Sequence, residues 1–245
     1  MAANNRKLSE YQEIIRKIIQ AFGEVRFYLV VESMLGVKVK PYSKDNPKDE
    51  ELVGEIAFIA DALTQIYNKN RIDEDLYSQI KGHRPTNFRP NEAAVLLEEL
   101  FAPTYQFLKD QLHFIKEIEH WGEKGYPDTR ITGKDGSVTY LEIKATTRPD
   151  QGSPRDFYFT PLKMAKMKIT SDAHHFILGF IVKESSPKLF HTIGWKLADL
   201  YKMNVSMKPE FNCNNLEIYK PEAIIRENLL ETGVGHGRQM PPLPF

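Results

Sequence analysis

The sequence predicts an α/β fold in which a central mixed β-sheet is flanked by helices and preceded by a helical lobe. Two observations lead to this prediction. Apolar residues recur at helical spacing through most of residues 1–80, whereas later segments alternate in the manner of strands. Beyond residue 90 the expected order is helix, three strands, helix, strand, which is typical of α/β domains.

The first eighty residues are expected to be mainly helical. An apolar stripe runs through residues 8–22, and a second follows residues 46–47, where a capping asparagine precedes a proline. Residues 25–35 are compatible with helix or strand, and we favour helix. Residues 82–90 contain two prolines and a glycine, which is typical of a linker. We therefore place the helical lobe at residues 1–88.

The sheet is expected in the second domain, residues 89–245, which ends in a C-terminal extension. A helix is predicted over residues 91–109, and a later one begins at Pro161. Residues 133–136 have the turn chemistry of a hairpin, and residues 189–219 are expected to add strands around a helical turn. The other strands are predicted at residues 113–121, 128–132, 138–146 and 175–183.

Composition narrows the function classes. The formal net charge is zero, which weighs mildly against a polyanionic partner. Cys213 is the single cysteine, so an internal disulfide and a zinc site built on cysteine pairs are excluded. The N-terminus shows no apolar stretch typical of a signal peptide, and residues 176–182 are too few to span a bilayer. We expect a cytoplasmic protein without membrane contact.

Residues 126–147 read YPDTRITGKDGSVTYLEIKATT and carry the chemistry. Alternate side chains of a strand share a face, so Glu142 and Lys144 point one way and the apolar residues around them point the other. The hairpin turn would bring Asp128 alongside Glu142. Carboxylate oxygens suit Mg²⁺, which also keeps waters and phosphate oxygens. We predict that Asp128 and Glu142 bind Mg²⁺ while Lys144 orients water and offsets phosphate charge. An exposed hairpin with a Glu–Lys pair is the structural alternative.

The same residues resemble a known family. Pro127-Asp128 followed by Glu142-Ile-Lys144 resembles the signature of the PD-(D/E)XK nucleases, and the resemblance is nearest to type II restriction endonucleases of the EcoRV kind. It covers about residues 91–184. It implies a restriction-endonuclease-like core, a Mg²⁺ cofactor and sequence-specific cleavage of double-stranded DNA.

The resemblance also implies roles for further residues. Glu99-Leu-Phe-Ala-Pro103 is similar to an upstream acidic helix of those enzymes, so Glu99 is expected as an auxiliary acid at a second metal position. Glu92 and Glu98 compete for that role. Ile143 joins Asp128, Glu142 and Glu99 as an expected metal ligand.

DNA contacts are expected from residues that follow the third strand. Lys163 and Lys166 would share one helix face, with Lys168 nearby, although a solvated face explains any single lysine equally well. Arg238 and Gln239 end a glycine-rich loop and can read guanine and adenine edges. His174 and His175 are expected to be structural. The arginines and lysines among the remaining expected DNA contacts could hold phosphates that flank the cut. These expected DNA contacts are Thr146, Thr147, Arg148, Arg155, Lys163 and Lys166.

We expect a homodimer, because one catalytic cluster per chain supplies one attack and a duplex has two strands. The helical lobe, acting as a dimerisation element or a DNA clasp, is expected to provide the interface. A monomer that nicks each strand in turn is the alternative. Other functions left open are a repair or recombination nuclease that reads DNA structure, a catalytically silent DNA-binding module, and a helical interaction protein. The apolar stripes offered for the interface are Ile14, Ile18 and Phe22, and Ile56, Ile59 and Leu63.

Overall fold

A computed structural model of the 245-residue chain describes residues 13, 14, 17, 24–69, 72–121, 125–147 and 168–206. The chain divides into two compact units, residues 1–22 with 208–245, and residues 23–207. The elements named below belong to the second unit. None of the described helices combines the length and the apolar character needed to cross a membrane.

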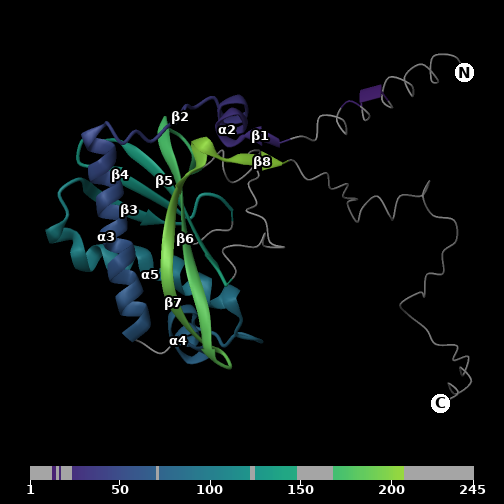
Figure 1. The fold of residues 1–245 in the computed structure, drawn as a ribbon, viewed down its shortest axis with the longest axis vertical. Helices are drawn as coiled ribbons and strands as arrows, with labels where there is room; N and C mark the ends of the chain where they lie inside the picture. The colour runs from purple at the N-terminus through teal and green to yellow at the C-terminus, as the bar shows by residue number, and fades with distance from the viewer. Residues whose placement is uncertain are drawn as a thin grey trace, which may run out of the picture. The chain divides into compact units, whose positions relative to one another are not determined.

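The second unit alternates helical and extended segments broadly as predicted (Figure 1). Its helical elements are α2 (Phe27–Leu35), α3 (Pro47–Lys69), α4 (Glu74–Lys81), α5 (Pro90–Leu108), and the 3-10 turns η1 (Lys109–Gln111) and η2 (Leu200–Lys202). Its strands are β1 (Glu24–Arg26), β2 (Val39–Lys40), β3 (Ile115–His120), β4 (Thr129–Gly133), β5 (Val138–Thr146), β6 (Ala173–Ser186), β7 (Leu189–Asp199) and β8 (Asn204–Ser206).

Local sequence signals set the helix ends. The Asp73 side chain accepts hydrogen bonds from the amides of Asp75 and Leu76 at 3.0 and 3.2 Å, which caps the start of α4. The helix ends at Gly82, whose φ of 73° is left-handed and therefore favours glycine. The predicted linker is thus the connection between α4 and α5, and the helix predicted at residues 91–109 is confirmed as α5.

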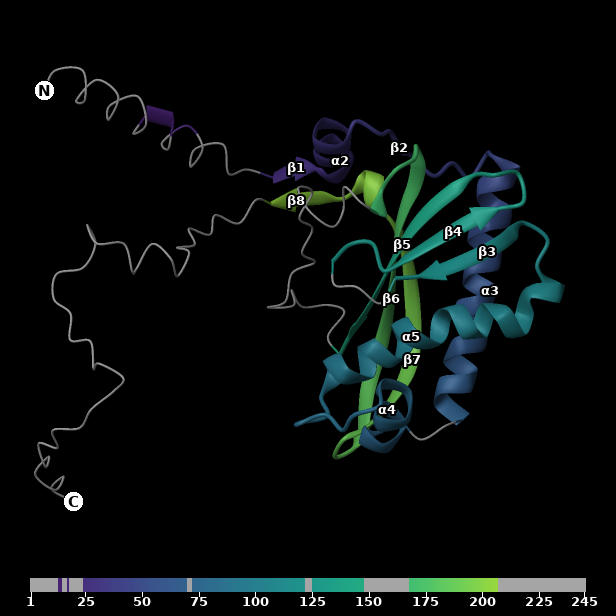
Figure 2. The ribbon, with the colours of Figure 1, turned by 180° about the vertical axis from the view of Figure 1, so that it is seen from behind.

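The sheet is mixed, as predicted. Its strands follow the order β2-β6-β5-β4-β3, and β7 also pairs with β6 (Figures 1 and 2). Strand β6 runs parallel to β2 and β5, whereas the β3–β4, β4–β5 and β6–β7 pairs are antiparallel. The two-residue strand β2 was not predicted, because its pairing with β6 is long-range. The helix predicted from Pro161 lies almost entirely outside the described residues, as does most of the one at residues 8–22.

The predicted β4–β5 hairpin is confirmed. The amide of Gly133 donates to the carbonyl of Ser137 at 2.8 Å, and Gly136 adopts a φ of 81°. A Cβ on Gly133 would approach the Ser137 hydroxyl to 2.6 Å, so a larger residue there would have to displace the Ser137 side chain. This hairpin sets the register that places the candidate site.

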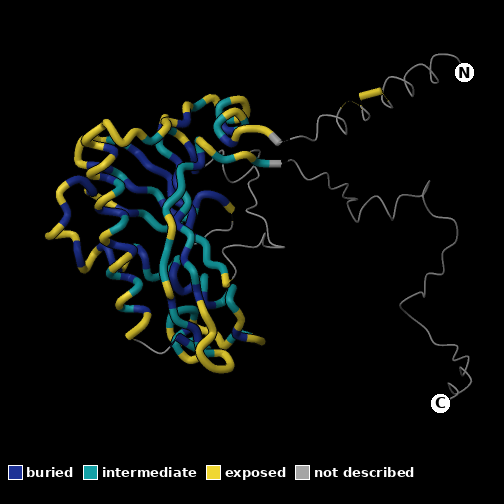
Figure 3. Tube along the Cα trace, in the orientation of Figure 1, coloured by how far each residue is buried: buried dark blue, intermediate teal, exposed yellow. Residues whose placement is uncertain are grey.

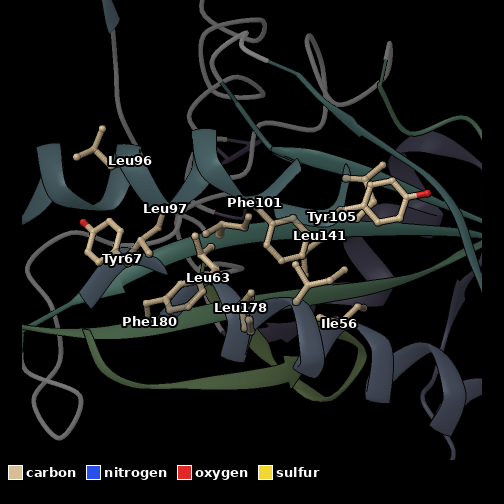
Figure 4. Packing of buried hydrophobic residues seen from close by; sticks show 14 of the residues in the cluster. Ile56, Leu63, Tyr67, Leu96, Leu97, Phe101, Tyr105, Leu141, Leu178 and Phe180 are labelled. Carbon is tan, nitrogen blue, oxygen red and sulfur yellow. The ribbon is translucent and has the colours of Figure 1, made fainter. Parts of the chain in front are cut away.

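Hydrophobic clusters lie on both faces of the sheet. One joins α3 and α5 to β5 and β6, and Figure 4 shows Leu63, Phe101, Leu141 and Phe180 meeting within it. The second packs Phe27 of α2 with residues of β5, β6 and η2. The central strands are consequently buried, whereas the tip of the β6–β7 hairpin at residues 183–188 is exposed (Figure 3).

Part of the predicted interface is wrong. Ile56, Ile59 and Leu63 have no exposed surface, because they face the sheet and α5 within the first cluster. Ile14 is described and half-exposed, whereas Ile18 and Phe22 lie outside the described residues. The stripe of α3 is therefore core. The division into a lobe at residues 1–88 and a domain at residues 89–245 stays a prediction.

Candidate active site

The β4–β5 register brings Asp128 next to Glu142. Thr129 pairs with Leu141 in an antiparallel ladder, so the residue before Thr129 lies beside the residue after Leu141. Asp128 is then held at two points: its Oδ2 accepts from the Ile143 amide at 2.9 Å, and its carbonyl accepts from the Trp121 amide at 2.8 Å. Asp128 and Glu142 therefore lie side by side, as the hairpin predicts.

Lys144 lies among three carboxylates. Its Nζ is 2.5 Å from Glu142 Oε1, 3.7 Å from Asp128 Oδ2 and 3.9 Å from Glu98 Oε1. The Glu142 side chain is only 4% exposed, whereas that of Lys144 is 43% exposed. The four side chains, which we call the acidic cluster, thus combine buried oxygen atoms with an ammonium that reaches solvent.

The α5 carboxylate in this cluster is Glu98, although the motif indicated Glu99. Glu99 Oε1 pairs with Lys81 Nζ at 2.6 Å, and its Oε2 is 3.8 Å from His120 Nε2. Neighbouring residues of a helix are about 100° apart around its axis, so the core packing of α5 directs one of them to Lys144 and the other elsewhere. The third competitor, Glu92, accepts from the Arg89 amide at the start of α5.

Burial and mutual repulsion govern the charges of the cluster. Burial, and then the negative charge of Asp128, raise the pKa of Glu142 to about 8 and that of Glu98 to about 7. Burial alone would lower the pKa of Lys144, but Glu142 and Asp128 outweigh it and the net direction is upward. Lys144 therefore stays protonated without fully neutralising the carboxylates. A cation of higher charge would be stabilised here.

The residues present fit a divalent cation in their donor chemistry. Glu142 Oε2 is buried and has no hydrogen-bond partner among the described residues, so one hard oxygen is left for a further ligand. In the described ranges no three histidine, cysteine, aspartate or glutamate side chains are already arranged around a metal position. Lys144 instead holds the carboxylates together.

The other predicted contacts are only partly visible. Thr146 ends β5 and is half-buried, while Thr147 is exposed just after it. His175 is structural as expected: its Nδ1 lies 2.6 Å from the Tyr126 hydroxyl inside the second hydrophobic cluster. His174 Nδ1 lies 3.0 Å from the Lys40 carbonyl. The remaining candidates, which fall outside the described residues, are Arg148, Arg155, Lys163, Lys166, Arg238 and Gln239.

Sequence reasoning misjudged Lys168. Its place near Lys163 and Lys166 predicts a phosphate contact or a solvated helix face, yet Lys168 is 6% exposed and donates to the carbonyls of Gly125 and Pro127 at 2.6 and 3.0 Å. Its Nζ also lies 5.6 Å from the centre of the Trp121 ring. No local pattern distinguishes a buried lysine from a solvated one at this position.

The proteins to which this chain is similar are type II restriction enzymes. Residues 21–222 match the family model described as the type II restriction enzyme MjaV family. The chain is 27% identical, over 236 residues, to the type II restriction enzyme MjaV of Methanocaldococcus jannaschii, covering 91% of this chain and 96% of that protein. The match spans every described element from α2 to η2. The chain therefore belongs to the MjaV family of type II restriction enzymes.

Proposed function

We propose that this sequence-specific DNA endonuclease hydrolyses phosphodiester bonds at the acidic cluster, with Mg²⁺ as its cofactor, in the manner of the PD-(D/E)XK nucleases. The observation that carries the proposal is the convergence of Asp128, Glu142 and Glu98 on the ammonium of Lys144. An incidental exposed hairpin would not bury Glu142 against two further carboxylates, because that arrangement costs free energy unless a ligand compensates.

Asp128 and Glu142 would hold the cation, with Glu98 as the auxiliary acid. The main-chain carbonyl of Ile143 would be a further ligand of the cation. Its amide points to Asp128, and the N–H and C=O of one strand residue point to the same side, so its carbonyl also faces the β4 side. The pairing of β4 with β5 extends along β5 as far as Leu141, two residues before Ile143. When bound, the cation would polarise the phosphate and lower the pKa of a water.

Lys144 would act on the reacting groups directly. It is protonated at neutral pH, its tip reaches solvent, and Glu142 holds its Nζ at 2.5 Å. From there the ammonium can donate to the attacking water and offset the charge that develops on the phosphate oxygens. Asp128 cannot move freely in this arrangement, because the amide of Ile143 fixes one of its oxygens.

The proposal extends to the residues that contact DNA and to the number of subunits in the working enzyme. Thr146 ends β5 two residues after Lys144, Thr147 follows it, and both are suited to contact the backbone of the bound duplex. Arg148, Arg155, Lys163 and Lys166 are proposed as phosphate contacts, and Arg238 and Gln239 as base-reading residues. The working unit is proposed to be a homodimer, with the acidic cluster of each subunit cutting one strand.

Digestion of a long DNA of known sequence with Mg²⁺, followed by mapping of the ends, tests this function. Discrete fragments are expected with Mg²⁺. With Ca²⁺ we expect DNA binding without cleavage, because its looser geometry positions water poorly. A smear would indicate cleavage without sequence reading. Full activity in the presence of a chelator would refute the proposed dependence on Mg²⁺. Sedimentation of the DNA complex separates a dimer from a monomer that accumulates nicked circles.

A further inference from the structure

Lys168 is a buried basic residue beside the turn that precedes β4 and carries Asp128. Only 6% of its surface is exposed, and its Nζ donates to two main-chain carbonyls, that of Gly125 at 2.6 Å and that of Pro127 at 3.0 Å. The ring of Trp121 lies beneath it, 5.6 Å from Nζ to the ring centre. These contacts replace water around a charge whose burial would otherwise be costly.

The two carbonyls belong to the turn that delivers Asp128. Gly125 and Pro127 flank Tyr126, and Pro127 is bonded directly to Asp128. The Tyr126 ring is buried and its hydroxyl meets His175, so the turn is anchored on one side by that ring and on the other by the lysine. Hydrogen bonds from a charged donor are about twice as strong as neutral ones, so Lys168 restrains the backbone more firmly than a neutral side chain would.

We propose that Lys168 is a positioning residue that fixes Asp128 for metal binding, an inference that rests on the proposed function of the acidic cluster. Asp128 has three anchors along its backbone and side chain: the Trp121 amide on its own carbonyl, the Ile143 amide on its carboxylate, and Lys168 on the carbonyl just before it. Trp121 belongs to two of these anchors, since its amide binds Asp128 while its ring lies under the lysine.

A small displacement of Asp128 matters because of what its carboxylate does. Its Oδ2 lies 2.9 Å from the Ile143 nitrogen and 3.7 Å from Lys144 Nζ, so movement of the turn alters the position of a proposed metal ligand and of the proposed catalytic ammonium together. Misplacement by about 1 Å commonly lowers a rate by roughly a hundredfold. Lys168 would thus influence catalysis without touching substrate.

The test replaces Lys168 with Met, which keeps the length but removes the donors, and compares it with Lys134→Met. Lys134 also donates to a main-chain carbonyl, that of Leu112 at 3.1 Å, but lies in the β4–β5 turn. For Lys168→Met we expect faster hydrogen exchange at the Ile143 and Trp121 amides, and a roughly 10- to 100-fold weaker Mg²⁺ affinity by calorimetry on the free protein. The Phe114 amide, which is held by Glu55, should be unchanged. Lys134→Met should leave the exchange of the Ile143 and Trp121 amides and the Mg²⁺ affinity unchanged.

Unchanged exchange at Ile143 together with parental Mg²⁺ affinity in Lys168→Met would overturn the proposal. If that variant does not fold, Lys168→Arg decides, because arginine keeps the charge but places its donors differently. A positioning role then requires faster exchange at Ile143 in a folded protein, and parental exchange would refute it. The exchange readout is independent of cleavage, so an active Asp128→Asn enzyme would refute the proposed function without deciding the role of Lys168.

Discussion

Two glutamates among the described residues are almost entirely buried, and their surroundings differ. Glu55 of α3 accepts hydrogen bonds from three consecutive amides at the start of β3, those of His113, Phe114 and Ile115, so both of its oxygens are satisfied. Glu142 of β5 has one oxygen against Lys144 and the other without a partner among the described residues. Both carboxylates join distant segments, but only Glu142 retains capacity for a ligand.

The difference separates a structural carboxylate from a functional one. The main-chain amides around Glu55 carry no net charge, but they donate hydrogen bonds to both carboxylate oxygens in place of water. These hydrogen bonds make the burial of Glu55 tolerable. Around Glu142 the neighbours include two more carboxylates, and its pKa rises to about 8 through burial and the charge of Asp128. Carboxylates that repel one another, with one buried oxygen left without a hydrogen-bond partner, are expected at a site that binds a ligand. Substitution of the two glutamates should therefore have opposite consequences.

The largest effect is expected for Glu142→Gln. Cleavage should fall by roughly 10³-fold or more, as for loss of a group that stabilises the transition state. The free energy of unfolding should be equal or higher, because the amide keeps the volume and cannot carry the buried negative charge that Asp128 and Glu98 repel. Glu51→Gln, at an exposed position of α3, is the matched control and should cleave normally. Rates on a defined DNA site and urea unfolding provide both values, and near-parental cleavage by Glu142→Gln contradicts its assignment.

Glu55→Gln should show the reverse pattern. The amide group keeps one acceptor oxygen, so at least one amide of the β3 start loses its partner and the free energy of unfolding should fall by about 2–4 kcal/mol. The cleavage rate per folded molecule should stay close to that of the parent. Urea unfolding and single-turnover cleavage measure the two quantities. If Glu55→Gln lost cleavage at unchanged stability, the structural role assigned to Glu55 would be wrong.

A smaller effect distinguishes the neighbouring acids of α5. Glu98→Gln should reduce cleavage roughly 10- to 100-fold, because it removes a charge that contacts Lys144. Glu99→Gln should weaken only the partly exposed pairs with Lys81 and His120, worth about 1 kcal/mol or less of stability. Both rates are measured at saturating Mg²⁺. If Glu99→Gln is the more damaged enzyme, the auxiliary acid is the one that the sequence motif indicated.

The smallest effect is a dependence of stability on pH in the metal-free protein. The folded-state pKa values of Glu142 and Glu98, about 8 and about 7, lie above the ordinary glutamate pKa of 4.5. Raised values favour folding at low pH, and this contribution is lost as pH rises through 7 to 8. The free energy of unfolding should therefore fall by about 1–2 kcal/mol between pH 6.5 and 8.

His175 changes the free energy of unfolding in the opposite direction, and in a lower pH range. Burial lowers its folded-state pKa to about 3 from 6.5, so its contribution is present above pH 6.5 and is lost as pH falls below that value. The range above pH 6.5 consequently isolates the glutamates. Glu142→Gln should flatten the slope there, and saturating Mg²⁺ should reverse the loss. Equal slopes in parent and variant, by urea unfolding at each pH, would exclude Glu142 as its source.

The sequence by itself determined the local geometry of the catalytic hairpin. Strand alternation places Glu142 and Lys144 on one face, and the turn at residues 133–136 places Asp128 next to Glu142, because both depend on neighbours within about twenty residues. The helix α5 and the strands on either side of the hairpin were predictable for the same reason. The family resemblance rests on this hairpin and added the expected nuclease activity.

Only the tertiary structure decided which distant side chains reach that hairpin. Whether Glu98 or Glu99 approaches Lys144 depends on the rotation of α5, which is set by the packing of its apolar residues against α3 and the sheet. The burial of Lys168 likewise depends on a turn some forty residues earlier in the chain. Local patterns carry no information about such contacts, because long-range packing selects one orientation among several that the helix or loop allows.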